Sequence, residues 1–247
     1  MSVDTPVYLI TGAAGGLGSA LAEQLLQQDL ANGIEPELIL LDKSVRALNH
    51  VSGMLEKEYG VQAILMPLDM AGAAITDYED VAAAINEQFG HLSAIFFCQA
   101  QFDGLRSLQQ THGRDWLLNL HANLGASQLL LQTTTGLLNN IKQSKVLFCC
   151  NAVDAVDSAY WGAYGVAQCA IPALAKQWAL ELSNTSIRVG LCQPAAMRTA
   201  LRAEVWPATP PEEWPTARAA ATAILEWLKR SDLEPELQLI DLRGNHV

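Results

Sequence analysis

The segment SAYWGAYGVAQCAI, residues 158–171, holds the side chain of this sequence best suited to proton transfer. Tyr164 stands at the start of a predicted helix, and a phenol can give a proton to a carbonyl oxygen or take one from an alcohol. A free tyrosine has a pKa of about 10, so it acts as a base near neutral pH only beside a positive charge. One helical turn later stands Gln168, which can form hydrogen bonds but carries no charge. The segment therefore predicts a catalytic position with weak electrostatic support.

Glycines between the first predicted strand and the first predicted helix form a second candidate site. The loop TGAAGGLG, residues 11–18, fits the pattern T-G-x-x-x-G-x-G. Gly12 permits a tight turn, Gly16 lets the backbone approach a pyrophosphate, and Gly18 allows close packing of the helix. The positive end of the helix dipole also favours an anion. The loop predicts dinucleotide binding, with Leu17 among the contacts, and a tight turn without a ligand is the alternative.

Carboxylates end the second and third predicted strands. Asp42 can accept hydrogen bonds from the adenosine ribose and repels a 2′-phosphate, which favours NAD over NADP. Lys43 follows directly and would by itself suit a phosphate, so NADP remains the alternative. Asp69 is placed to contact the adenine amino group or to cap the next turn. The predicted cofactor is NAD.

Strand-like and helix-like runs alternate along the chain and must position these residues. The predicted strands are 7–11, 37–42, 61–69, 94–98, 145–150, 187–192 and 237–241. The predicted helices are 16–30, 44–59, 76–89, 112–138, 162–183 and 216–230. Apolar strands separated by helices are typical of a parallel sheet covered by helices on both faces. We therefore predict a single α/β domain over residues 1–247, a doubly wound sheet of about seven parallel strands flanked by helices.

The segment VWPATPPEEWPTAR, residues 205–218, breaks this alternation. Its four prolines disfavour a continuous helix. The surrounding stretch 194–215 is therefore either a mobile substrate lid or a static surface loop. We favour the lid, because Trp206 and Trp214 would otherwise face bare solvent.

Composition narrows the class of protein. The net charge of −11 argues against nucleic-acid or anionic-membrane partners, which require an excess of Lys and Arg. No apolar run approaches the roughly 18–20 residues that span a bilayer, and the N-terminus has no basic region typical of a signal peptide. The five cysteines lack CxxC spacing and the five histidines are scattered, so we expect reduced thiols and no metal site. These features predict a cytoplasmic protein.

Together the motifs resemble the short-chain dehydrogenase/reductase (SDR) family over essentially the whole chain. The motifs in family order are the glycine loop, Asp42, Asp69, the Tyr164 helix and QPAAMRTAL (193–201), whose Pro194 and Thr199 match the family segment P-G-x-x-x-T. The resemblance implies a Rossmann-like fold, with Pro194 and Thr199 at the cofactor, and hydride transfer between nicotinamide and a carbonyl or alcohol substrate. It also implies a homodimer or homotetramer, in which the leucine-rich helix 112–138 and the Tyr164 helix pair across a two-fold axis.

The family's catalytic set can be carried over position by position. In the family a tyrosine is the general acid/base, a serine orients the substrate oxygen, a lysine binds the nicotinamide ribose and lowers the tyrosine pKa, and an asparagine holds a relay water. Tyr164 matches the tyrosine and Asn123 matches the relay asparagine. The serine position, thirteen residues before Tyr164, is Asn151, and the lysine position, four residues after it, is Gln168. Two catalytic positions are kept and two are replaced.

Two further departures concern the predicted cofactor contacts. The family's N-N-A-G turn reads CQAQ at 98–101, where added side chains would crowd the adenosine ribose. Ala195 replaces a glycine beside the nicotinamide. Lys145 begins its strand at the end opposite the cofactor, so it cannot replace the lysine, and a contact from Arg198 remains open.

Two functions therefore remain open. The replaced residues favour an NAD(H)-binding protein with a weakened or lost catalytic site, either a pseudoenzyme or a binding or regulatory subunit. The kept residues favour an atypical NAD-dependent oxidoreductase acting on a small carbonyl or alcohol substrate. The altered turn at 98–101 also leaves open whether any cofactor binds.

Overall fold

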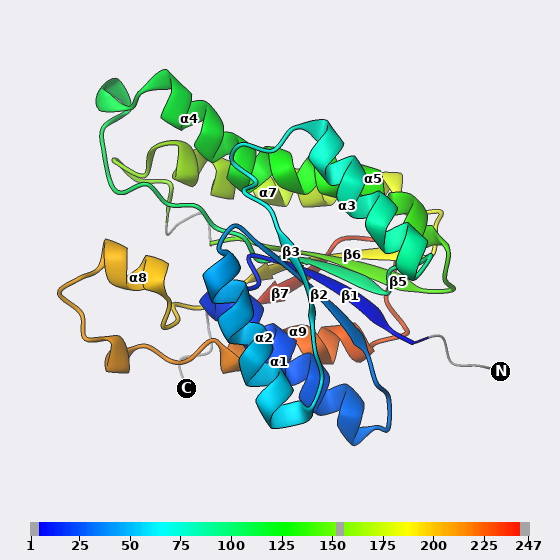
Figure 1. The fold of residues 1–247 in the computed structure, drawn as a ribbon. Helices are drawn as coiled ribbons and strands as arrows, with labels where there is room; N and C mark the ends of the chain where they lie inside the picture. The colour runs from blue at the N-terminus through cyan, green and yellow to red at the C-terminus, as the bar shows by residue number, and fades with distance from the viewer. Residues whose placement is uncertain (1–4, 152–155, 243–247) are drawn as a thin grey trace.

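A seven-stranded parallel sheet forms the centre of the computed structural model, which describes residues 5–151 and 156–242 (Figure 1). The strand order is β3-β2-β1-β4-β5-β6-β7, and every neighbouring pair is parallel. The strands are β1 (Val7–Thr11), β2 (Glu37–Asp42), β3 (Ile64–Pro67), β4 (Ala94–Phe97), β5 (Ser144–Cys149), β6 (Ile187–Gln193) and β7 (Gln238–Asp241). The chain reverses its direction across the sheet between β3 and β4, so β1 and β4 border the position where open α/β sheets bind ligands. The predicted doubly wound, Rossmann-like architecture is confirmed.

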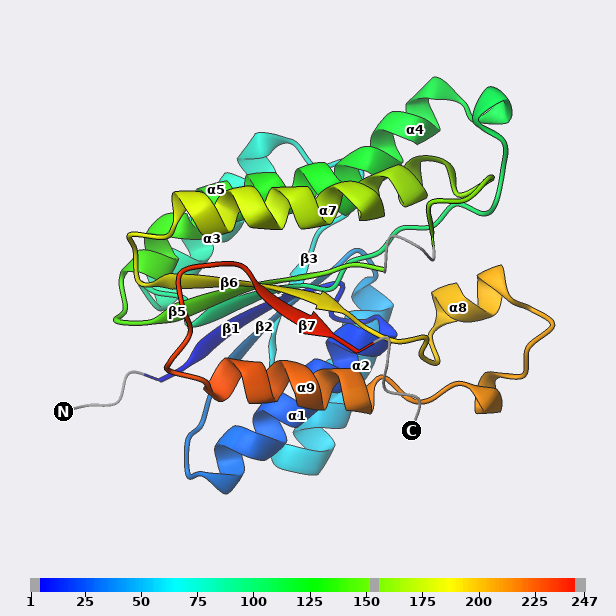
Figure 2. The same cartoon turned by 180° about the vertical axis from the view of Figure 1, so that it is seen from behind.

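Two helical layers cover the sheet, as the two opposite views show (Figures 1 and 2). One layer contains α1 (Gly16–Ala31), α2 (Val45–Tyr59) and α9 (Arg218–Lys229), and the other contains α3 (Ile75–Gln88), α4 (Gly113–Leu120), α5 (Ala126–Asn139) and α7 (Gly162–Glu181). Adjacent strand residues face opposite layers, because side chains alternate along a strand. Leu9 therefore belongs to the core beneath α3, α5 and α7, whereas Ile10 belongs to the core beneath α1, α2 and α9.

Local sequence signals account for several helix ends. The Ser44 hydroxyl accepts a hydrogen bond from the Ala47 amide at 3.2 Å and so caps the start of α2. Gly60 follows α2 in the left-handed conformation (φ 73°), where glycine carries no steric cost. Lys145 donates hydrogen bonds to the carbonyl oxygens at the end of α9, including that of Arg230 at 2.6 Å. This places Lys145 at the end of the sheet opposite the glycine loop, as predicted.

The predicted helix 112–138 is interrupted. Between α4 and α5 the turn His121–Gly125 is π-helical, so the backbone carries one wider turn there. Such turns occur mostly at functional sites, because they displace side chains from regular helical spacing. The turn contains Asn123, which the resemblance assigned to a proton relay.

The segment 194–215 is more ordered in its backbone than predicted. It contains the short helix α8 (Ala200–Val205) and a 3₁₀ turn (Pro211–Glu213), and Figure 2 shows α8 standing beyond the carboxyl edge of the sheet. Trp206 and Trp214 are both half-buried, as the lid argument required. Closure of this segment over a ligand stays a prediction.

Helix length and exposed apolar side chains bear on the predicted membrane and subunit contacts. None of the helices in the described ranges is both long and apolar enough to cross a bilayer. Leu117 of α4 and Val166 and Leu180 of α7 are exposed. These apolar side chains lie on the helices expected to pair in an oligomer, and that pairing stays a prediction.

Candidate functional site

A cavity of about 680 Å³ opens at the carboxyl ends of the strands. Within its lining we distinguish two ends, each named after its characteristic residues. The glycine-loop end comprises Gly12, Gly16, Leu17, Asp42, Lys43 and Asp69. The tyrosine end comprises Asn151, Trp161, Tyr164, Gln168, Arg202 and Trp206. Pro194 and Thr199 also line the cavity, so residues from widely separated segments of the chain meet around one space.

The glycine loop is packed closely, and at Gly12 and Gly18 backbone atoms occupy the space that a side chain would need. A Cβ atom on Gly12 (φ 60°) would lie 2.6 Å from the Gln99 Cα, and one on Gly18 would lie 2.4 Å from the Gly12 oxygen. A Cβ on Gly16 would lie 2.9 Å from the Thr199 Cγ2. Gly18 does not line the cavity, which suits its predicted role in close packing. Gly16 lines the cavity but is also approached by the chain segment before α8.

The first turn of α1 faces the cavity through Gly16 and Leu17. Its N-cap is Gly15, no side chain caps it within the described chain, and no acidic residue stands in its first turn. Free amides at the start of a sixteen-residue helix attract anions through hydrogen bonding and through the helix dipole. This end of the cavity therefore suits a phosphate-bearing ligand.

Carboxylates at the glycine-loop end are held by backbone amides. Asp42 accepts hydrogen bonds from the amides of Ala14 at 3.2 Å and Ser44 at 3.0 Å. Asp69 accepts one from the Ala71 amide at 3.2 Å, which is the capping alternative, and it also lines the cavity. Lys43 is exposed beside Asp42. Two backbone amides therefore fix the Asp42 carboxylate at the edge of the cavity, beside the exposed Lys43.

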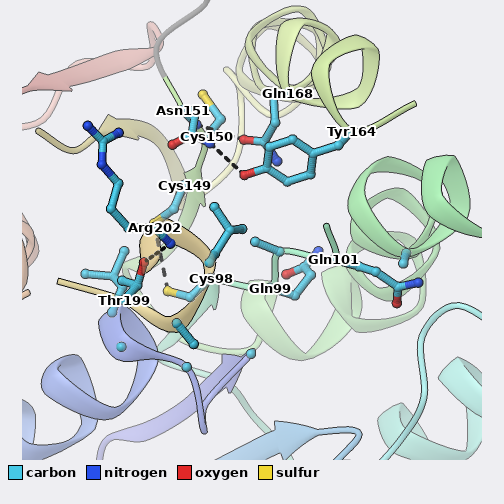
Figure 3. A pocket seen from close by; sticks show the side chains of 18 of the residues that line it. Cys98, Gln99, Gln101, Cys149, Cys150, Asn151, Tyr164, Gln168, Thr199 and Arg202 are labelled. Atoms are coloured by element: carbon cyan, nitrogen blue, oxygen red, sulfur yellow. Dashed lines mark hydrogen bonds between the residues drawn. The ribbon is translucent and has the colours of Figure 1, made fainter. Parts of the chain in front are cut away.

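At the tyrosine end, Asn151, Tyr164 and Gln168 form one hydrogen-bonded group (Figure 3). The Asn151 side-chain amide donates to the Tyr164 hydroxyl at 2.6 Å. The Asn151 backbone amide donates to the Gln168 Oε1 at 2.8 Å. Gln168 is only 2% exposed, so it fills its position and anchors the end of β5. The two replaced positions thus contact each other and the tyrosine.

Burial keeps the Tyr164 phenol protonated. The side chain is 3% exposed and lies against the rings of Phe102 and Trp161, at centroid distances of 5.5 and 6.0 Å. This burial raises the pKa of Tyr164 far above its ordinary value, and the neighbouring Cys150 acts in the same direction. The hydrogen bond from Asn151 lowers the pKa, but by less, and no cation contributes to this balance. This environment favours the protonated phenol, which can donate a hydrogen bond.

The turn at 98–101 leaves the cavity open. The Gln99 side chain is hydrogen-bonded to the hydroxyl groups of Thr11 and Ser127, between β1 and α5. Figure 3 shows the Gln101 side chain pointing away from Tyr164. Gln99 and Gln101 nevertheless line the cavity, so the predicted crowding of a ligand by this turn stays a prediction.

Asn123 braces that turn and does not line the cavity. Its side chain donates to the Gln101 carbonyl at 2.9 Å and accepts from the Gln101 amide at 2.8 Å. A further bond joins it to Asn119. With these partners Asn123 fixes the backbone after β4, and its side chain is not directed to the Tyr164 hydroxyl.

The cation at the tyrosine end is Arg202 rather than Arg198. Arg198 borders a separate hollow between α1 and α2, together with Glu23 and Met54. The Arg202 side chain lines the main cavity, and its guanidinium stacks 3.6 Å from the centre of the Trp206 ring. The sequence did not indicate Arg202 as a site residue, because only the folded segment places its guanidinium against the tryptophan rings.

Thiols line the floor of the cavity between its two ends. The Cys98 and Cys149 sulfur atoms lie 3.8 Å apart on neighbouring strands, and both cysteines are free. Hydrogen bonds with the Cys192 and Cys98 thiols, followed by burial, raise the pKa of Cys149, so the thiol stays protonated and is a poor nucleophile. The described residues contain no group of three or more His, Cys, Asp or Glu side chains placed to hold a metal.

Comparison with known proteins places this cavity in context. Residues 6–210 match the family model described as short chain dehydrogenase. An uncharacterized oxidoreductase of Escherichia coli K12, YciK, is 23% identical over 226 residues, covering 92% of this chain and 86% of that protein. A structure described as a short chain dehydrogenase from Pseudomonas syringae is 26% identical with a TM-score of 0.86, covering 97% of this chain and 95% of its own. Another from E. coli CFT073, complexed with NADPH, is 23% identical with a TM-score of 0.85, covering 96% and 98%.

Proposed function

The chain belongs to the short-chain dehydrogenase/reductase family of oxidoreductases, and from that premise we propose that it binds a nicotinamide dinucleotide at a catalytic site that is weakened or lost. Such a protein serves as a binding or regulatory subunit. When bound, the nicotinamide would supply or take up a hydride. All other steps would fall to residues of the tyrosine end.

The glycine-loop end supports dinucleotide binding. Its uncapped helix start suits a pyrophosphate, and the absence of side chains at Gly12 and Gly16 lets the loop pack closely against Gln99 and Thr199. Asp42 and Asp69 stand at the ends of β2 and β3, where an adenosine would extend. We propose Leu17, Pro194 and Thr199 as further contacts, since all three line the same cavity.

The choice between NAD and NADP depends on Asp42 and Lys43. The carboxylate of Asp42 would repel a 2′-phosphate, which supports NAD. The NADPH complex of the E. coli CFT073 relative supports NADP as the alternative, and exposed Lys43 gives that alternative a partner for the phosphate. We propose NAD because Asp42 is held in place by two backbone amides, whereas Lys43 projects toward solvent.

A single observation carries the proposal of weakened catalysis, namely the environment of the Tyr164 hydroxyl. It is buried, its pKa is raised, and its contacts are Asn151 and aromatic rings rather than a cation. Gln168 occupies the family's lysine position and is bonded to the Asn151 backbone instead. Alcohol oxidation requires a base at this position, and the raised pKa of Tyr164 opposes that role.

The Asn151–Tyr164 hydrogen bond favours a second candidate, an atypical reductase. Because Asn151 donates to the phenol oxygen, the proton of Tyr164 itself is available to a carbonyl oxygen in the cavity. When a hydride reaches the carbonyl carbon, the Tyr164 proton would pass to the substrate oxygen, and the resulting phenolate would regain a proton from solvent. Carbonyl reduction starts from the neutral phenol, so this candidate is assayed in that direction.

Fluorescence titration with NADH and NADPH tests cofactor binding, and failure of both to bind would remove both candidates. Turnover on a panel of aldehydes and ketones then separates them. We expect no turnover by the wild type, and activity in the double variant Asn151→Ser/Gln168→Lys. Circular dichroism of each variant is needed, because lysine cannot accept the Asn151 amide hydrogen bond. Substantial wild-type reduction would establish the reductase instead.

A further inference from the structure

Arg202 is held in one orientation by two indole rings. Its guanidinium carbon lies 3.6 Å from the centre of the Trp206 ring and 4.0 Å from the centre of the Trp214 ring. Cation–π attraction stabilises both contacts. Because indoles cover the guanidinium, its N–H groups are left to bind in the plane of the group. That arrangement suits the two oxygens of a carboxylate, which a guanidinium binds through paired hydrogen bonds.

No acid neutralises this arginine within residues 5–151 and 156–242. The ion pairs there involve other arginines and lysines, and the Arg202 Nε is buried without a hydrogen-bond partner. Burial lowers the pKa of the guanidinium, but arginine stays charged in proteins. A partly desolvated cation that lacks an anionic partner is costly, and an anionic ligand would offset that cost.

The position of Arg202 connects it to the tyrosine end. Trp206 lies 5.8 Å from Trp161, and Trp161 lies 6.0 Å from Tyr164, measured between ring centroids. Figure 3 shows Arg202 and Tyr164 on opposite sides of the view, with Asn151 and Cys149 between them. The contacts of Trp206 and Trp161 thus form an aromatic path from the Arg202 guanidinium to the Tyr164 phenol. Of the described charged residues lining the cavity, the other three, Asp42, Lys43 and Asp69, belong to the glycine-loop end.

We propose that the tyrosine end binds an organic acid with an aromatic or other flat apolar body, and that Arg202 recognises its carboxylate. The apolar body packs on Trp206 and Trp161, and the opposite end of the ligand reaches the hydroxyl of Tyr164. The inference rests on the proposed function only in placing the ligand beside the dinucleotide site. In a protein with a net charge of −11, such a ligand needs a local cation, and Arg202 provides it.

Three probes of one shape test this assignment on the wild-type protein: 3-phenylpropanoate, 3-phenylpropanamide and 3-phenylpropylammonium. Ligand-observed NMR titration gives their dissociation constants. We expect the carboxylate to bind at least tenfold more tightly than the amide, and the ammonium to bind most weakly. Equal affinity of carboxylate and amide would overturn the proposal. This comparison needs no variant, so a misfolded mutant cannot obscure it.

Charge-matched variants then locate the effect. Arg202→Gln should reduce the preference for carboxylate over amide to within twofold, and Arg202→Lys should retain part of it. Arg198→Gln removes one positive charge from the same segment outside the cavity and should keep the full preference. Loss of the preference in the Arg198 variant, or its persistence in Arg202→Gln, would contradict the assignment.

An NADH titration of the same variants separates this inference from the proposed function. We expect Arg202→Gln to change NADH affinity by no more than about twofold. A tenfold loss of NADH affinity in this variant would assign Arg202 to the dinucleotide and overturn the inference. If no dinucleotide binds the wild type but carboxylate selectivity is found, the proposed function fails while the organic-acid site stands.

Discussion

The two ends of the cavity are built by different parts of the chain. At the glycine-loop end, the backbone of Gly12 and Gly16 lines the cavity, and an added Cβ at either position would meet a neighbouring part of the chain. At the tyrosine end, side chains define the surface through the Asn151–Tyr164 hydrogen bond and the stacking of Arg202 on Trp206. A substitution that alters a surface made of backbone atoms also disturbs the packing of the fold. A side-chain surface can change its chemistry while the fold remains.

This difference bears on the proposed function, because Asn151 and Gln168 both lie at the tyrosine end. Gln168 is 2% exposed and accepts the Asn151 amide hydrogen bond. Under the proposed function, glutamine at this position carries no charge toward Tyr164 but contributes a contact to the fold. No substitution at Gly12 can add a stabilising contact in this way, because an added methyl group would meet the backbone of Gln99.

The largest expected effect of a single substitution is at Gly12. Gly12→Ala combines a left-handed backbone (φ 60°) with a Cβ placed 2.6 Å from the Gln99 Cα. We expect the free energy of unfolding, measured in urea, to fall by at least about 3 kcal/mol, and dinucleotide binding to be lost.

Gly33→Ala is the matched control, because Gly33 has φ 73° and no atom lies within 4 Å of the position that a Cβ would take there. It should cost only the conformational strain of about 1–2 kcal/mol. Equal losses in the two variants would mean that the close approach of Gly12 to Gln99 has no energetic weight.

A smaller loss is expected at the tyrosine end from Gln168→Leu. Leucine has nearly the same size but cannot accept the Asn151 amide, so a buried donor loses its partner. The free energy of unfolding should fall by about 1–3 kcal/mol. Gln88→Leu, at an exposed position on α3, should change it by less than about 0.5 kcal/mol. An unchanged stability for Gln168→Leu would show that glutamine contributes nothing to the fold there.

The glycine-loop end was also the more predictable from sequence, for the same physical reason. Its signals are local: apolar runs indicated the strands, and glycine spacing indicated the loop between β1 and α1. The π-helical turn at Asn123 and helix α8 were not predicted, because tertiary contacts decide them. Arg202 was not predicted, because its contacts with Trp206 and Trp214 form only when the segment folds and no spacing in the sequence indicates them. Resemblance supplied the pairing of Asn151 with Tyr164, whose contact at 2.6 Å no local pattern could give.

Cofactor preference tests whether side chains also matter at the glycine-loop end. Asp42→Asn removes the negative charge while keeping an oxygen that can accept an amide hydrogen bond. The ratio of the NADPH to the NADH dissociation constant should fall about tenfold, which corresponds to about 1.4 kcal/mol. Asp77→Asn, on α3, is a charge-matched control and should leave the ratio unchanged. A ratio that stays constant in Asp42→Asn would remove the basis for proposing NAD.

The smallest expected effect is the pH dependence contributed by Tyr164. Its pKa is raised in the folded protein above the value of about 10 for an unfolded chain, so below pH 10 both states keep the proton. The difference in free energy of unfolding between wild type and Tyr164→Phe should therefore be constant from about pH 7 to about pH 9. Above about pH 10 only the unfolded state loses the proton, and wild-type stability should fall relative to the variant by up to about 1.4 kcal/mol per pH unit. A difference that changes between those two lower pH values would reveal a phenolate in the folded site, and the tyrosine end would then hold the base that its surroundings argue against.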